Sequence, residues 1–205
     1  MTNQILIERI FSGRRAELKR IILLQALSCF LEKGIEATTI EMIRDRAEAS
    51  VGVIYHHFKN KEGIISALFF AALDDQSQRR EEALQQATSL QQGIISIVES
   101  YIDWVEQNPD FARFLYAARL NIAENNASEE LQLRNQQRNQ ALMAWFQQQQ
   151  DFAILQKIPH ELLLSLVIGA TESYCRAWLS NKVKTSPQQY KSVLAQSAWN
   201  ALIHL

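Results

Sequence analysis

The 205-residue chain has the composition of an ordinary globular protein, with 47% hydrophobic and 21% charged residues and a formal net charge of −1. That net charge excludes a protein whose whole surface is basic, as expected of one that coats nucleic acid. The charge is unevenly spread: residues 1–62 carry ten Lys/Arg and eight Asp/Glu, and the remaining residues carry eleven Lys/Arg and fourteen Asp/Glu. Cys29 and Cys175 form no Cys-x-x-Cys pair and favour buried, reduced thiols in a cytoplasmic protein. The apolar residues near the N-terminus are interrupted by Glu8 and Arg9, so we expect neither a secretory signal nor a membrane span.

Apolar residues recur at helical spacing along almost the whole chain, and no stretch shows the alternation typical of a strand. We therefore predict an all-α fold of about nine helices, with an arm or helical extension over residues 1–13 and a loop at Asn125 and Asn126. Gly34 is the expected C-cap of the first long helix. The predicted helices cover approximately residues 14–33, 38–47, 50–58, 60–87, 94–107, 109–122, 128–150, 159–179 and 187–205.

Two of these helices are short and meet at a tight turn between Thr38 and Lys61. Thr38 and Glu41 have the spacing of a capping box at the start of the first helix, and Ser50 is the N-cap expected for the second. The helix over residues 14–33 can support the pair. This arrangement is typical of a helix-turn-helix, which places the N-terminus of its second helix in the DNA major groove.

The C-terminal half has features of a ligand-binding and dimerising bundle. The helix over residues 159–179 is apolar nearly all round and the final helix is amphipathic, so we expect the last two helices to form an intermolecular four-helix bundle. Glu172 either neutralises a cationic ligand or pairs with Arg176 four residues on. The aromatic side chains either line a pocket or belong to the core. The candidate ligand-binding residues are Trp104, Phe111, Phe114, Trp145, Glu172, Tyr174 and Trp178.

Residues 14–70 resemble the N-terminal DNA-binding domain of the TetR (tetracycline-repressor) family of bacterial regulators. The residues that carry the resemblance are Phe30, Gly34, Thr38, Thr39, Ile43, Ala47, Ser50, Gly52, the run from Ile54 to Lys59, Lys61 and Glu62. The resemblance implies a helix-turn-helix domain over residues 1–62 and a ligand-binding and dimerisation domain over residues 63–205. It also implies a cytoplasmic homodimer that represses transcription at a palindromic operator in double-stranded DNA and is released by a small hydrophobic or cationic effector.

The same resemblance implies which residues meet DNA. Thr38 or Thr39 would contact a phosphate, and Lys61 would hold another at the start of the next helix. The residues assigned to the interface are Thr38, Thr39, Ser50, Val51, Gly52, Val53, Tyr55, His56, His57 and Lys61.

Three positions depart from the family pattern. Glu48 stands where the family usually has the turn glycine, and Val51 and Val53 replace side chains that often form hydrogen bonds. We therefore expect readout to rely on Tyr55, on His56, on contacts with thymine methyl groups and on DNA shape. Two arginines of the first short helix, Arg44 and Arg46, are expected to pair on the surface with Asp45 or Glu48.

No motif points to an enzyme, and no metal or cofactor is expected. His56 and His57 lack a third and fourth ligand at suitable spacing, and Glu-x-x-His is absent. The Gly-x-Ser-x-Gly, Walker and Gly-x-Gly-x-x-Gly patterns are absent as well. The alternative to a regulator is a helical ligand-binding or protein-interaction module of the same fold without sequence-specific DNA binding, which the two valines favour.

Overall fold

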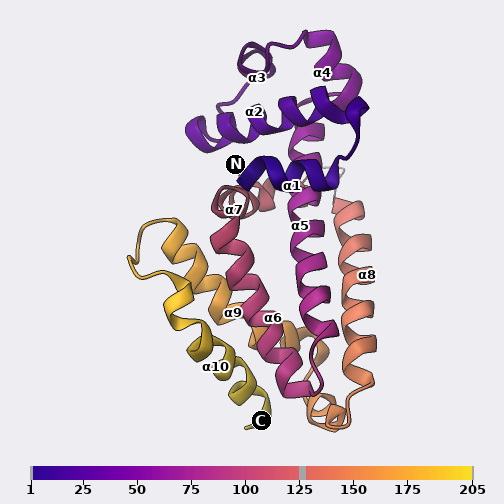
Figure 1. The fold of residues 1–205 in the computed structure, drawn as a ribbon, viewed down its shortest axis with the longest axis vertical. Coiled ribbons are helices and arrows are strands. Elements are labelled where there is room, and N and C mark those ends of the chain that lie inside the picture. The colour runs from indigo at the N-terminus through magenta and orange to yellow at the C-terminus, as the bar shows by residue number, and fades with distance from the viewer. Residues whose placement is uncertain (1, 125–127, 205) are drawn as a thin grey trace. The chain divides into compact units, whose positions relative to one another are not determined.

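The computed structural model describes residues 2–124 and 128–204, which contain helices and no strand (Figure 1). The all-α prediction is confirmed, and the nine predicted helices appear within a few residues of their expected bounds. The α-helices of the described residues are α1 (Thr2–Ile10), α2 (Glu17–Lys33), α3 (Ile40–Ala47), α4 (Val51–Phe58), α5 (Lys61–Gln85), α6 (Leu90–Gln107), α7 (Pro109–Glu124), α8 (Ser128–Gln147), α9 (His160–Leu179) and α10 (Lys191–Ile203).

The differences from the prediction lie at the ends of elements. Of the two alternatives expected for residues 1–13, the helical extension is the one found, over residues 2–10, which brings the number of described α-helices to ten. Short 3-10 helices at Arg14–Ala16, Phe152–Lys157 and Pro187–Tyr190 connect longer ones. The loop predicted at Asn125 and Asn126 lies outside the described residues. None of the described helices is both long and apolar enough to cross a membrane.

Packing divides the chain into two compact units. The first comprises Met1–Asp75 and Asn108–Gln132, and the second comprises Gln76–Gln107 and Leu133–Leu205. The boundaries therefore fall inside α5, between α6 and α7, and inside α8. The division at residue 62 that the family resemblance implies concerns function, and it stays a prediction.

The first unit is built on α2, whose buried face carries Leu23, Leu27 and Phe30 at helical spacing. The helices α1, α3 and α7 pack against α2. Phe114 of α7 stacks on Phe30 with ring centroids 5.7 Å apart, so a segment more than 80 residues downstream returns to support the helix-turn-helix. Gly34 ends α2 with a φ of 86° and donates its amide to the Phe30 carbonyl at 2.9 Å, as expected of a C-cap.

The N-terminal helix α1 is an integral part of this unit. Leu6 and Ile7 are fully buried, which aligns α1 along the core. Arg9 forms an ion pair with the buried carboxylate of Asp75 in α5, and Asn3 donates a hydrogen bond of 2.9 Å to Asp110 at the start of α7. Burial of two side chains and two polar contacts explain why residues 2–10 are helical although sequence periodicity there is short.

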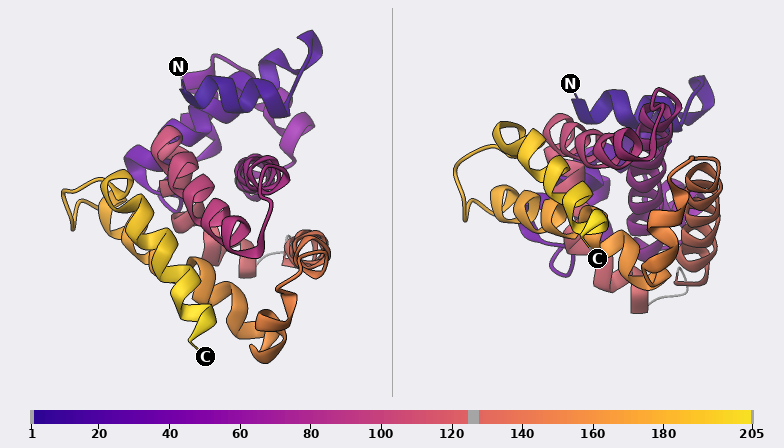
Figure 2. Two further views of the ribbon diagram at one scale, coloured as in Figure 1. Left: turned by 60° about the horizontal axis from the view of Figure 1, so that its bottom comes forward. Right: turned by 90° about the horizontal axis from the view of Figure 1, so that it is seen from below.

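The second unit is a bundle in which α6, α9 and α10 pack against one another (Figure 2). Lys191 at the start of α10 donates to both carboxylate oxygens of Asp103 in α6, at 2.7 and 2.8 Å. On another side of α6, the indole of Trp145 lies where a side chain at Gly93 would be, so only glycine lets α8 approach α6 this closely. The three helices α6, α9 and α10 thus form the centre of this unit.

Candidate functional site

The first short helix, α3, begins one residue later than the capping box predicts. Thr39 is the N-cap, because its Oγ1 accepts a hydrogen bond of 3.3 Å from the Met42 amide. Thr38 is buried, and its hydroxyl lies 2.7 Å from the Gly34 carbonyl and 3.2 Å from that of Cys29. The prediction of Thr38 as the cap is therefore wrong: its hydroxyl ties α3 to the end of α2 instead.

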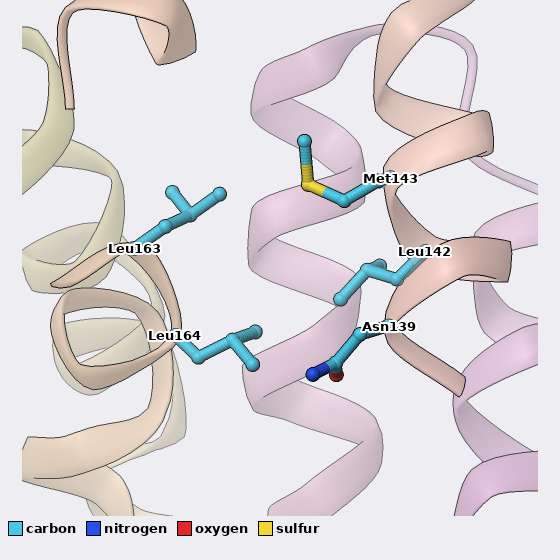
Figure 3. A pocket seen from close by; sticks show the side chains of 5 residues that line it. All are labelled: Asn139, Leu142, Met143, Leu163 and Leu164. Atoms are coloured by element: carbon cyan, nitrogen blue, oxygen red, sulfur yellow. The ribbon is translucent and has the colours of Figure 1, made fainter. Parts of the chain in front are cut away.

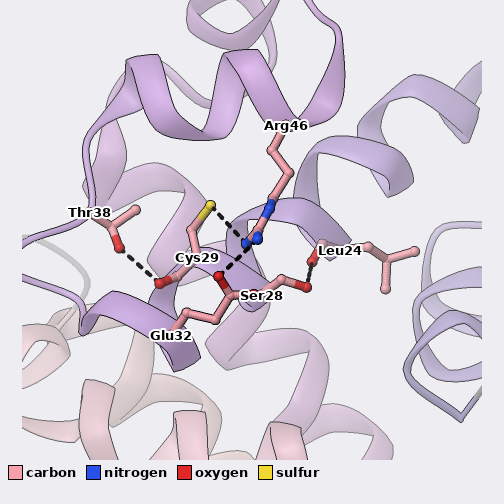
Figure 4. A network of polar contacts seen from close by, with 6 residues as sticks. All are labelled: Leu24, Ser28, Cys29, Glu32, Thr38 and Arg46. Atoms are coloured by element: carbon pink, nitrogen blue, oxygen red, sulfur yellow. Dashed lines mark hydrogen bonds and ion pairs between the residues drawn. The ribbon is translucent and has the colours of Figure 1, made fainter.

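A network of polar contacts fixes α3 on α2 (Figure 4). Arg46 of α3 donates to the Glu32 carboxylate at 2.8 Å and lies 3.7 Å from the Cys29 sulfur. The hydrogen bond from Arg46 is the main cause that lowers the pKa of Glu32. Arg44 pairs with Asp45, as expected, whereas Arg46 pairs with Glu32, a partner from another helix that sequence spacing could not indicate.

The turn between α3 and α4 places a glutamate in a left-handed conformation. Glu48 has φ 50° and ψ 35°, the region that glycine adopts at least cost. Its amide bonds to the Arg44 carbonyl and closes the end of α3. The turn geometry at Glu48 is thus the one a glycine would provide, with the strain of a β-carbon added.

The recognition helix candidate α4 begins at the predicted cap. Ser50 Oγ accepts a hydrogen bond of 3.3 Å from the Val53 amide, and Ile54 and Phe58 bury one face of the helix. The opposite face is exposed and includes Gly52, Tyr55 and His56, which follow each other at one-turn spacing. No acidic residue occurs in α4.

Lys59 continues this exposed face and was missed by sequence reasoning. It lies seven residues after Gly52, so the spacing i, i+3, i+4, i+7 that joins it to Tyr55 and His56 could have found it. Lys59 has φ 65° and ψ −47°, and the Asn60 amide bonds to the Phe58 carbonyl at 2.8 Å, which makes a γ-turn. This turn ends α4 and directs the chain into α5.

The start of α5 is held tightly against its surroundings. Asn60 caps the helix by accepting from the Gly63 amide at 2.8 Å. The Lys61 ammonium donates to the carbonyls of Ile35 and Glu36 at 3.1 and 3.3 Å. A β-carbon at Gly63 would overlap the Phe58 carbonyl oxygen. Lys61 and Gly63 therefore fix the end of α4 relative to α5.

The residues predicted to bind an effector are divided between the two units. Phe111 and Phe114 are fully buried in the first unit, where Phe114 stacks on Phe30. The other five lie in the second unit, on different helices: Trp104 on α6, Trp145 on α8, and Glu172, Tyr174 and Trp178 on α9.

Two of these side chains on α9 have structural partners. Tyr174 donates a hydrogen bond of 3.0 Å to the Thr185 carbonyl and packs edge-on against Tyr190, with ring centroids 5.5 Å apart. Glu172 lies near the fully buried Cys175, whose pKa is raised to about 12 by burial first and then by the charges of Glu106 and Glu172. Cys175 therefore stays a neutral thiol at physiological pH.

Among the described residues of the second unit, one hollow lies between α5 and α6 and another between α8 and α9. The larger is an open groove of about 320 Å³ between α5 and α6, lined by Arg79, Glu82, Ala83, Ser100, Asp103, Trp104 and Gln107. The smaller holds about 10 Å³ between α8 and α9 and is lined by Asn139, Leu142, Met143, Leu163 and Leu164 (Figure 3). Trp104 is the member of the predicted effector set that lines a described hollow.

No three His, Cys, Asp or Glu side chains gather in a way that could hold a metal ion within residues 2–124 and 128–204.

Residues 22–68 match the family model described as bacterial regulatory proteins of the tetR family. This match covers α3, α4 and most of α2, the elements whose geometry is described above. The helix-turn-helix region is therefore similar to the TetR family. The predicted family is thereby confirmed, and its members are regulators of transcription.

Two relatives illustrate how the similarity is distributed. The chain is 42% identical over 64 residues to the HTH-type transcriptional repressor KstR2 of Rhodococcus jostii, which is 31% of this chain and 29% of that protein. It is 22% identical over 191 residues to the HTH-type transcriptional activator FasR of Mycolicibacterium smegmatis, covering 93% of this chain and 85% of that one. The stronger identity is therefore confined to less than a third of either chain.

The fold as a whole is shared with solved TetR-family structures. A regulator from Marinobacter aquaeolei superposes with a TM-score of 0.75 at 19% identity, over 92% of this chain and 97% of that one. The fatty acid degradation regulator FadR of Bacillus halodurans superposes with a TM-score of 0.73 at 15% identity, over 88% and 97%. At such identities the likeness concerns the fold.

Proposed function

We propose that this protein is a dimeric, DNA-binding transcriptional regulator that represses a promoter by occupying a palindromic operator and leaves it when a small effector binds. The observation that carries the proposal is the exposed face of α4, which is capped at Ser50, free of acidic residues and continued by Lys59. Such a helix suits the negatively charged major groove.

Some of the proposed DNA contacts position the protein on the phosphate backbone, and others read the bases. The Ser50 oxygen accepts from the Val53 amide, and the Ser50 hydroxyl hydrogen is proposed to donate to a phosphate. Of the two threonines, Thr39 is the proposed phosphate contact because Thr38 is buried. The Thr39 hydroxyl also hydrogen-bonds Glu41 and lowers its pKa, after the larger contribution of the Glu41 amide, so phosphate binding requires that hydroxyl to turn.

Bases are read by the side chains in the middle of α4. Tyr55 is 50% exposed, and His56 is exposed beside it. Val51 and Val53 are half-buried and offer methyl groups to thymine. Gly52 has open space where a β-carbon would be, which allows the backbone to approach the DNA.

Backbone contacts complete the proposed interface at the end of α4 and the start of α5. His57 is half-buried at the edge of the exposed face, where it suits a sugar-phosphate contact. Lys61 has two of its three N–H groups directed at carbonyls, and the third is assigned to a phosphate.

Dimerisation through α9 and α10 follows from the apolar surface of these elements. The large apolar side chains exposed there are Leu162, Tyr190, Val193 and Ile203. A second copy would bury them and place two recognition helices about 34–36 Å apart, as two half-sites one helical turn apart require. The dimer is proposed to act in the cytoplasm.

A hydrophobic effector is proposed to bind the second unit and to act on DNA binding through α5, which is continuous between the two units. Two solved relatives name such ligands: a FadR of Bacillus subtilis in complex with stearoyl-CoA, and a ketosteroid regulator, KstR2 of Mycobacterium tuberculosis. Because FasR is called an activator, repression is the part of the proposal that a transcription assay tests directly.

Selection from random duplexes, followed by gel shift of the full chain at several salt concentrations, tests DNA recognition. We expect a palindromic sequence to be enriched and a Tyr55→Ala variant to lose affinity about tenfold or more, since discriminating base contacts contribute about 1–3 kcal/mol. Uniform binding to all sequences, or none at low salt, would refute the regulator and favour a ligand-binding or protein-interaction module of the same fold.

A further inference from the structure

The connector between α1 and α2, residues 11–13, is held by a single guanidinium. Arg20 Nη1 donates hydrogen bonds of 2.8 Å to the carbonyls of both Phe11 and Gly13. Gly13 allows the turn with a φ of 87°, which glycine adopts at little cost. The 3-10 helix that follows, Arg14–Ala16, therefore starts from a fixed position on α2.

Lys19 places this connector beside the end of α4. Its ammonium lies 4.4 Å from the centroid of the Phe11 ring and 5.7 Å from that of Phe58, the last residue of α4. Both distances are within the range of a cation–π contact. One ammonium thus joins the connector to the C-terminal end of the helix that is proposed to enter the major groove.

Arg14 and Arg15, directly after the connector, carry two positive charges that are available for binding. Both residues are exposed, and within the residues that the structure describes neither guanidinium forms an ion pair or a hydrogen bond. Glu17, the nearest acid along the sequence, is exposed and pairs with neither. Several other arginines of the first unit are paired with carboxylates, namely Arg9, Arg44, Arg46 and Arg113.

Lys59 adds a third exposed positive charge at the same place, since it directly follows Phe58. The connector and the end of α4 therefore present like charges to solvent next to each other. Such a cluster suits a row of phosphates, which carries regularly spaced negative charge.

We propose that Arg14 and Arg15 bind phosphates of the DNA backbone that flank the base pairs read by α4. The location of this contact rests on the proposed function, in which the N-terminal end of α4 enters the major groove. The C-terminal end then lies at the edge of the groove, where the backbone runs, and the connector lies beside it. Because Arg20 already fixes the connector, binding orders two side chains and no backbone, which lowers its entropic cost.

The salt dependence of DNA affinity tests this contact. Each phosphate that a protein neutralises on duplex DNA contributes about 0.9 to the slope of log K against log salt concentration. Replacing both residues in the full chain, as Arg14→Gln with Arg15→Gln, should reduce this slope by about 2 and lower the affinity at least about tenfold at moderate salt. The pair Arg14→Lys with Arg15→Lys keeps both charges and should keep the slope. An unchanged slope in the glutamine variant would overturn the contact.

Lys182→Gln is the matched control for the loss of charge. Lys182 is an exposed residue of the second unit, so its replacement should change neither slope nor affinity. A reduction in slope as large as that of the glutamine variant would mean that net charge alone is responsible. All of these variants should melt at the wild-type temperature, because the replaced side chains are exposed.

Shortening the duplex locates the contact. Removing the base pairs that flank the selected operator should weaken binding of the wild-type protein. The same removal should affect the glutamine variant little, because it makes no contact with those phosphates. An equal loss in both proteins would overturn the flanking site.

The outcomes also distinguish this contact from the proposed function, since phosphate contacts carry no sequence information and the slope can be measured on any duplex. Equal binding to all duplexes, with a slope that the glutamine variant reduces, would refute the regulator and uphold the contact. Sequence-selective binding with the same slope in both proteins would uphold the regulator and overturn the contact. A protein that binds no duplex at low salt would overturn both.

Discussion

The helix-turn-helix and the C-terminal bundle differ in how directly a residue's position in the sequence gives its place in the structure. In the first unit the candidate DNA-binding residues follow one another at fixed offsets along two capped helices, so Gly52, Tyr55 and His56 lie together on one exposed face. In the second half all the candidate effector residues except Glu172 were chosen by aromatic character, and two of them, Phe111 and Phe114, belong to the other unit. Local spacing determines a helix face, whereas a pocket depends on which helices pack together.

The largest expected effect contrasts two members of the predicted effector set. Phe114→Ala should lower the free energy of unfolding by about 3–5 kcal/mol, since it deletes a fully buried ring that stacks on Phe30. Trp178→Ala, at a half-buried position of α9, should cost clearly less. Urea denaturation measures both. Unchanged stability of Phe114→Ala, with lost effector binding, would make Phe114 a pocket residue after all.

The junction between α4 and α5 gives the next largest effect. Gly63→Ala places a methyl group where the Phe58 carbonyl oxygen lies, so we expect a loss of about 1–3 kcal/mol from overpacking. Because Phe58 ends α4, DNA affinity should fall as well. The control is Glu62→Ala, one residue away at an exposed position, which should change neither quantity strongly. If Gly63→Ala melts at the same temperature as this control, α4 and α5 do not approach each other as closely as described.

Gly52→Ala should separate DNA binding from stability. The added methyl group meets no protein atom within 4 Å, and alanine is the better helix former, so stability should stay equal or rise by up to about 1 kcal/mol. On DNA the same methyl group obstructs close approach, and we expect at least about a tenfold loss of affinity, or 1.4 kcal/mol. Paired melting and gel-shift measurements test this, and unaltered DNA affinity would remove Gly52 from the interface.

The smallest expected effect is a gain. Glu48→Gly should stabilise the protein by about 1 kcal/mol, since the residue has a φ of 50° that glycine adopts without the cost of a β-carbon. Glu48→Gln is the matched control: it removes the charge, keeps the β-carbon and should leave stability nearly unchanged. Equal stabilisation by both variants would mean that the charge of Glu48, rather than its backbone, is responsible.

The caps show what sequence can and cannot decide within one helix pair. Ser50 was predicted as a cap and is one, and Asn60 caps α5 in the same way. Thr38 and Thr39 offer the same chemistry at adjacent positions. The choice between them depends on the carbonyls of Cys29 and Gly34 at the C-terminal end of α2, which accept from the Thr38 hydroxyl.

Buried charge was the feature that sequence could not anticipate. Arg80 lies in the helix predicted over residues 60–87, and its side chain is only 14% exposed. Arg46 could have paired with either nearby acid of its own segment, and its observed partner Glu32 is 14 residues away on α2. In both cases the environment of the charge is set by a second helix, and no periodicity within one helix specifies it.

The stack of Phe114 on Phe30 bears on how this protein could be recombined with its relatives. A chimaera joined at residue 62 would set Phe30 against whatever side chain a foreign seventh helix supplies, and would also separate α1 from Asp75 and Asp110. Exchange of residues 1–62 alone as a DNA-binding domain should therefore yield poorly folded hybrids. A graft that carries residues 108–132 along with residues 1–75 keeps these partners together. The segments needed to transfer DNA recognition are therefore not contiguous in the sequence.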